Sequence, residues 1–119
     1  MQDPSRLRVF PIAEGVALNV YRLTRTFPIE ERFGLTQQMR RAAVAIGSDI
    51  VEGCARSGAK DFARFLEMAL GYAAELQFQL RISYKSGYVE DGDYESTSND
   101  LEQVQRMLIR LIKRVRPAP

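Results

Sequence analysis

The chain has 119 residues, which is enough for one domain and too few for two ordinary hydrophobic cores. Hydrophobic residues make up 45% of it and charged residues 27%, so a globally disordered chain is not expected. Seventeen Lys and Arg against fifteen Asp and Glu leave a net charge of +2. That total indicates no nucleic-acid binding unless the basic residues gather into patches.

Histidine is absent, and this excludes several classes of enzyme. Without an imidazole the chain builds neither a Ser-His-Asp nor a Cys-His arrangement, nor the Glu-x-x-His sites of ferritin-like bundles. The single cysteine, Cys54, makes no intrachain disulfide, and we expect it to be a small packed residue. The first four residues lack the features of a secretory signal, and no apolar run is long enough to span a bilayer. We therefore expect a soluble, cytoplasmic protein.

Amphipathic segments separated by turn residues predict four helices and no strands. The predicted helices cover residues 12–26, 35–56, 60–86 and 94–115. Phe27-Pro28 ends the first, because a proline disfavours the α conformation in the residue before it. Arg56-Ser57-Gly58 and Gly87 end the second and third. Short connections favour antiparallel neighbours, so we expect one all-α domain over residues 1–119, an up-down-up-down four-helix bundle.

Each segment carries an apolar stripe at helical spacing, which predicts the core. The stripes are Ala13, Val16, Val20, Leu23 and Phe27; Leu35, Met39, Ala43, Ile46 and Ile50; Phe62, Leu66, Ala69, Ala73, Leu76 and Leu80; and Leu101, Val104, Leu108, Leu111 and Val115. Thr36 is the expected N-cap of the second helix, and the polar cluster at 96–100 could cap the fourth.

The second and third segments also carry apolar residues away from their stripes. In the second these are Val44, Val51 and Ala55, and its polar arc is Arg41, Ser48, Asp49, Glu52 and Arg56. In the third they are Met68, Gly71, Phe78 and Ile82, with Glu67 and Glu75 among them. These second faces are not needed in an isolated bundle, where one apolar stripe per helix is enough.

Two explanations fit the second faces. Neighbouring loops could cover them as parts of a wide core, or they could form a subunit interface, which contiguous exposed apolar patches often mark. Gly47 and Gly71 would allow helices to approach closely, although a glycine also lowers helix stability. We favour an interface between identical chains. Its predicted residues are Val44, Gly47, Val51, Met68, Gly71, Glu75, Phe78 and Ile82.

The run from Arg40 to Gly53 carries a family resemblance. With Phe27-Pro28, Glu30-Glu31, Gly34-Leu35-Thr36, Gln38, Phe65-Leu66 and Glu75-Leu76, it resembles the four-helix-bundle family named after proteins encoded in intervening sequences of large-subunit ribosomal RNA genes. The resemblance covers about residues 10–112. The chain departs from the family pattern at Ala45, Asp49, Val51 and Tyr72, where the family has Ser, Asn, Ala and Ser.

The resemblance implies a small four-helix bundle that in relatives assembles into a five-fold ring. It also implies a link to RNA, and a related branch of accessory factors to retroelement reverse transcriptases binds nucleic acid through basic surface. No catalytic activity comes with the family. The number five rests on the resemblance alone, because helical periodicity does not determine a subunit count.

Carboxylates on the two middle helices offer a second kind of site. Asp49 and Glu52 lie three residues apart on one helix, and Glu75 lies on the next, so together they could hold a hard cation. All-α nucleotide pyrophosphatases hold Mg²⁺ in this way, but with paired signatures of which only one is present here. Alternatively, Glu52 pairs with a nearby arginine. A structural role is the favoured interpretation.

Basic residues gather in two clusters. One is Arg40, Arg41, Arg56, Lys60 and Arg64, on or near the hairpin formed by the second and third helices. The other is Arg106, Arg110, Lys113, Arg114 and Arg116 at the end of the fourth. The clusters either complement helix dipoles and favour solubility, or contact phosphates. No aromatic residues interleave with them as a base-stacking platform requires. The predicted nucleic-acid-binding residues are Arg40, Arg41, Arg56, Lys60, Arg64, Arg110, Lys113 and Arg114.

The sequence therefore predicts a non-enzymatic homo-oligomer, a ring of five by resemblance, that serves as a binding or scaffold module. The expected partners are further copies of the chain, and RNA, DNA or a protein that handles them. No membrane, metal or cofactor is expected. Two alternatives remain open: a Mg²⁺-dependent nucleotide hydrolase using Asp49, Glu52 and Glu75, and a purely structural protein–protein assembly.

Overall fold

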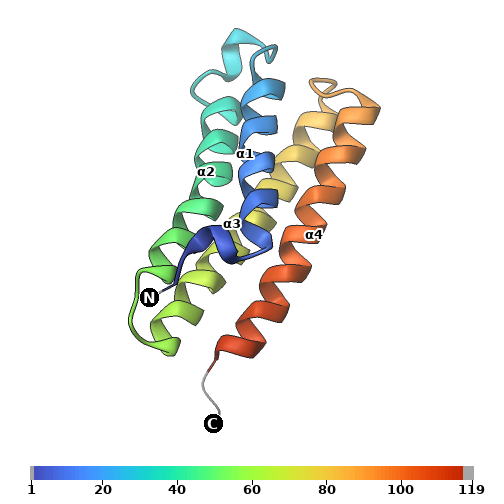
Figure 1. Ribbon diagram of the computed structural model, residues 1–119. Helices are drawn as coiled ribbons and strands as arrows, with labels where there is room; N and C mark the ends of the chain where they lie inside the picture. Colours follow the sequence, from blue (N-terminus) through green and yellow to red (C-terminus); the bar gives the residue numbers. More distant parts are fainter. Residues whose placement is uncertain (1, 117–119) are drawn as a thin grey trace.

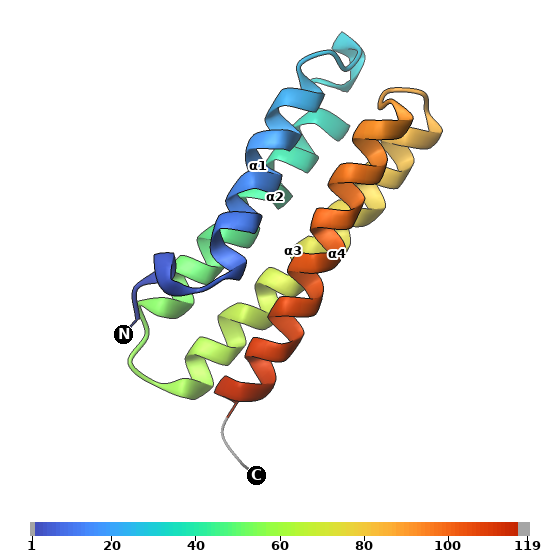
Figure 2. The same ribbon diagram turned by 45° about the vertical axis from the view of Figure 1, so that its right-hand side comes forward.

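The computed structural model describes residues 2–116 as four long helices and two short 3-10 helices (Figure 1). The elements are η1 (Pro4–Arg6), α1 (Val9–Thr24), η2 (Ile29–Glu31), α2 (Leu35–Cys54), α3 (Ala59–Lys85) and α4 (Asp91–Val115). Each long helix packs against the next, and α1 also packs against α4, which closes the bundle (Figure 2). The predicted all-α, antiparallel four-helix bundle is confirmed, and residues 2–116 contain no strand.

The core consists of the four predicted stripes. Met39, Ile46, Leu66 and Leu108 have no exposed surface. Burying an aliphatic side chain of this size stabilises the fold by about 1.5–3 kcal/mol, so these positions dominate folding. Residues at the ends of the stripes, such as Val115, are only half-buried because a helix end has neighbours on fewer sides.

The helix boundaries differ from the prediction at two starts. Helix α1 begins at Val9, so Pro11 lies in its first turn. A proline is tolerated there because the N–H groups of the first turn have no carbonyl acceptor within the helix, so the missing N–H costs no helical hydrogen bond. Helix α4 begins at Asp91, where Asp91 and Asp93 complement the positive end of the helix dipole.

Both capping predictions were wrong. Gly34 is the N-cap of α2, the Leu35 N–H donates to Glu31 Oε1 at 3.2 Å, and Thr36 is buried inside the helix. The polar cluster at 96–100 lies inside α4, where the fully buried Thr97 accepts a hydrogen bond from Asn19 Nδ2 at 2.5 Å. Because Asn19 belongs to α1, this bond aligns α1 with α4.

The two ends of the bundle carry different parts of the chain. The start of α1, the end of α4 and the α2–α3 connection lie at one end, and the other two connections lie at the opposite end (Figure 1). None of the helices described in residues 2–116 is long and apolar enough to cross a membrane.

Candidate functional site

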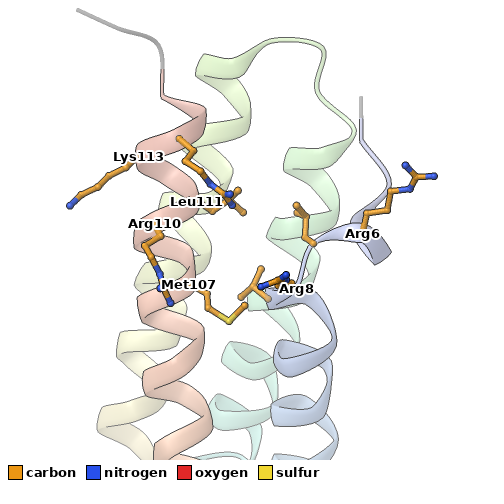
Figure 3. A pocket seen from close by; sticks show the side chains of 9 residues that line it. Arg6, Arg8, Met107, Arg110, Leu111 and Lys113 are labelled. Carbon is orange, nitrogen blue, oxygen red and sulfur yellow. The ribbon is translucent and has the colours of Figure 1, made fainter.

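A basic pocket opens between η1, the start of α1 and the last turns of α4 (Figure 3). The cavity measures about 690 Å³. Its lining residues are Arg6, Leu7, Arg8, Val9, Met107, Arg110, Leu111, Lys113 and Arg114. Figure 3 shows Arg8 beside Met107 in the middle of the cavity, with Arg6 and Lys113 reaching outward from its two rims.

The pocket is strongly positive. Five of its nine lining residues are Arg or Lys, and none is Asp or Glu. Within residues 2–116 none of these five cations forms an ion pair. The uncapped start of α1 adds the partial positive charge of a helix N-terminus, because Arg8 occupies the N-cap position without a side-chain cap. A concave surface with charge of one sign concentrates counter-ions, so this pocket favours anions.

The sequence identified only half of this pocket. Arg110, Lys113 and Arg114 were among the predicted nucleic-acid-binding residues, and the structure places all three on its α4 side. Arg6 and Arg8 were missed, since an isolated pair of arginines before the first helix carries no periodic signal. The topology was the available clue, because an up-down-up-down bundle brings the start of its first helix next to the end of its last.

The structure separates the first predicted basic cluster. Arg40 and Arg41 lie far from the α2–α3 connection, and both line a cavity at the opposite part of α2. Arg40 packs 4.7 Å from the ring centre of Tyr21, and its Nε donates to Thr24 Oγ1 at 2.9 Å. Arg40 therefore ties α2 to α1, and the first basic cluster divides into two separate groups along the α2–α3 hairpin.

The remaining members, Arg56, Lys60 and Arg64, lie at the α2–α3 connection, and the two arginines contact neighbouring side chains there. Arg56 forms a 3.0 Å ion pair with Glu52, and Arg64 lies 3.7 Å from Asp61. Both guanidinium groups also lie over the ring of Phe65, at 4.8 and 4.7 Å from its centre. These contacts order the connection and occupy part of the donor capacity that a phosphate would need.

The three carboxylates of the hydrolase alternative share no partner. Glu52 pairs with Arg56, and Glu75 Oε1 accepts from Gln79 Nε2 at 3.2 Å. Asp49 is buried rather than part of the exposed polar arc, which corrects the prediction, and its Oδ2 has no hydrogen-bond partner among the described residues. Burial raises the pKa of Asp49, and the charge of Glu52 raises it further. Between residues 2 and 116 no three His, Cys, Asp or Glu side chains form a group suited to a metal.

The second apolar faces are exposed. Val44, Val51, Met68, Phe78 and Ile82 keep between 37% and 63% of their surface open. The loop explanation therefore fails within this chain, because neither the loops nor the neighbouring helices cover them. Their exposure agrees with an interface but does not by itself say what covers them.

Comparison with known proteins places the chain in a family. A sequence model of the 23S rRNA-intervening sequence protein family matches residues 5–110. The chain belongs to this family. The predicted resemblance is therefore confirmed. No curated protein matches the sequence.

A solved structure supports the same fold. The crystal structure of a protein with unknown function from the S23 ribosomal protein family of Bacteroides thetaiotaomicron has 27% sequence identity and a TM-score of 0.81. The match covers 88% of this chain and 95% of that one. The similarity therefore extends to the whole bundle rather than to a pair of helices.

Proposed function

We propose that this member of the intervening-sequence protein family is a non-enzymatic, homo-oligomeric binding module that contacts the phosphate backbone of RNA or DNA. The observation that carries the proposal is the basic pocket, where five cations surround one cavity of about 690 Å³ without a carboxylate. None of these five forms an ion pair within residues 2–116, whereas Arg22, Arg56, Arg64 and Arg116 each do.

The chemistry of the pocket suits phosphate contact without base recognition. Arginine and lysine bind phosphate oxygens and release condensed counter-ions from the nucleic acid. No aromatic residue lines the pocket, so it offers no platform on which a base would stack. Binding should therefore depend strongly on salt and weakly on sequence.

Assembly would multiply this contact. Exposed apolar side chains on α2 and α3 support a homo-oligomer, and the five-fold ring is the expectation from the family resemblance. Several identical pockets on one assembly raise the affinity for a long polyanion well above that of one subunit. The hydrolase alternative gains no support, because Asp49, Glu52 and Glu75 do not form a group suited to a metal ion within residues 2–116.

Equilibrium binding to mixed-sequence RNA tests this proposal. The purified full chain is titrated into fluorescently labelled single-stranded RNA at several salt concentrations. We expect binding that weakens steeply with salt and changes little between RNA sequences. Binding that is absent at low salt, or insensitive to salt, would leave a purely structural protein–protein assembly as the better explanation.

A further inference from the structure

A second cavity combines arginines with aromatic rings at the end of the bundle opposite the basic pocket. It measures about 630 Å³, which is within the size range of ligand sites. It lies between the end of α1, the segment after η2 and the first half of α2, near the α1–α2 connection (Figure 1). The aromatic and charged residues that line it are Tyr21, Phe33, Arg32, Arg40 and Arg41. We call this surface the aromatic cavity.

Both rings of the aromatic cavity are open to solvent. Phe33 keeps 75% of its surface exposed and Tyr21 keeps 41%. Neither ring packs in the core described for residues 2–116, so the fold does not require an aromatic residue at either place. The guanidinium of Arg32 lies 4.8 Å from the ring centre of Phe33, and that of Arg40 lies 4.7 Å from the ring centre of Tyr21. Aromatic rings and guanidinium planes are the flat surfaces on which unpaired bases stack.

The aromatic cavity is also positively charged. Among the described residues that line it, none is Asp or Glu. Arg32, Arg40 and Arg41 form no ion pair within residues 2–116. Arg40 uses its Nε to bond Thr24, so Arg32 and Arg41 are the better donors for a bound anion. The cavity therefore favours an anion that carries a flat ring.

The sequence did not indicate this combination. Tyr21 belongs to α1 and Phe33 to the segment before α2, so only folding brings them beside Arg40 and Arg41. The expectation that no aromatic residue accompanies the first basic cluster is therefore wrong for its Arg40 and Arg41 part.

A nucleotide of a single strand has the chemistry that these residues recognise. Its base offers a flat apolar face to the rings, and its phosphate offers oxygens to the guanidinium groups. The amide of Gln37 and the hydroxyl of Ser48 also line the cavity and are exposed, so they can hydrogen-bond a sugar or a base edge. A duplex does not present this chemistry, because its base faces are covered by the neighbouring base pairs.

We propose that the aromatic cavity binds an unpaired nucleotide of a nucleic-acid single strand. The base stacks on Phe33, Tyr21 lines the same cavity, and Arg32 and Arg41 hold the phosphate. This inference rests on the nucleic-acid binding of the proposed function and adds a second site of different chemistry. The basic pocket contacts phosphates alone, whereas the aromatic cavity distinguishes a single strand from a duplex. The described lining residues of the two sites do not overlap.

Replacing the more exposed ring tests the stacking. Phe33→Leu keeps an apolar side chain at a surface position, so the circular dichroism spectrum should be unchanged. Binding to a labelled oligouridine, measured by anisotropy, should weaken roughly 5-fold or more, as expected for the loss of one base–aromatic contact. Binding to the duplex of the same strand with its complement should be unchanged. Phe33→Tyr keeps the ring and should bind the single strand as the wild type does.

The salt dependence separates stacking from phosphate contact. Stacking releases no condensed counter-ion, so Phe33→Leu should lower the affinity at every salt concentration and leave the slope of log K against log salt unchanged. Arg41→Gln removes a phosphate contact and should flatten that slope by about 0.7. Tyr72→Leu is the matched control, since Tyr72 is an exposed aromatic residue on α3 outside both sites, and it should change neither the affinity nor the slope.

The two proposals fail in different ways. A wild-type chain that binds no RNA overturns both. RNA binding that Phe33→Leu leaves unchanged, or weakens equally for the single strand and the duplex, overturns only the inference about the aromatic cavity. An equal loss in Tyr72→Leu also overturns it, because the effect would then belong to exposed rings in general. Displacement of the strand by micromolar adenosine monophosphate would assign the cavity to a free nucleotide and overturn the single strand as its ligand.

Discussion

Neutralising the basic pocket should flatten the salt dependence of RNA binding. If all five lining cations contact phosphates, the slope of log K against log salt is about −3.5 per subunit for a single strand, at about −0.7 per contact. Affinity then falls roughly 100-fold between about 50 and about 200 mM salt. The triple variant Arg8→Gln, Arg110→Gln, Arg114→Gln keeps two cations, so its slope becomes about −1.4 and the loss only about 7-fold.

Fluorescence anisotropy of a labelled single-stranded RNA measures both slopes. The control variant is Arg25→Gln, Arg81→Gln, Lys85→Gln, which lowers the net charge by the same amount at exposed positions outside the pocket. We expect the control to keep most of the wild-type slope. Equal flattening in both variants would show that only the total charge matters, and an unchanged slope in the pocket variant would show that the five cations do not contact RNA.

Three predictions concern stability and are measured by urea unfolding. The pKa of Asp49 is raised in the folded state, so the unfolded chain loses this proton at a lower pH than the folded chain does. The free energy of unfolding therefore falls as the pH rises from 3.8 through the folded-state pKa. Asp49→Asn does not ionise and should stabilise the chain at pH 7. This gain should vanish at a pH below the unfolded value of 3.8, and a constant gain would argue against the titration. Gly53→Ala should cost about 1–3 kcal/mol through contact with Phe62, whereas Gly15→Ala, in open space, should gain up to about 1 kcal/mol. Leu108→Ala should cost about 3–5 kcal/mol, and a loss below 1 kcal/mol would contradict its complete burial.

Local signals predicted the fold well. The apolar stripes needed only the period of a helix, and Leu66 and Leu108 are buried as that period requires. Helix starts were harder to place, because several polar residues compete to cap the same turn. Helix α4 starts at Asp91 and α2 follows Gly34, and both residues precede the polar residues that the sequence favoured as N-caps. At α2 the hydrogen bond from the Leu35 N–H goes to Glu31, which belongs to the segment before the helix.

The sequence by itself determined which residues face the core and that apolar side chains remain outside it. Only the tertiary structure decided which surfaces those side chains share. A helical period gives the direction of a side chain about its own axis, but not which neighbouring helix lies in that direction. For this reason Asp49, predicted in an exposed arc, is buried, while Val44 joins Tyr21 of α1 in a groove. The basic pocket has the same origin, since bundle closure alone brings Arg8 beside the end of α4.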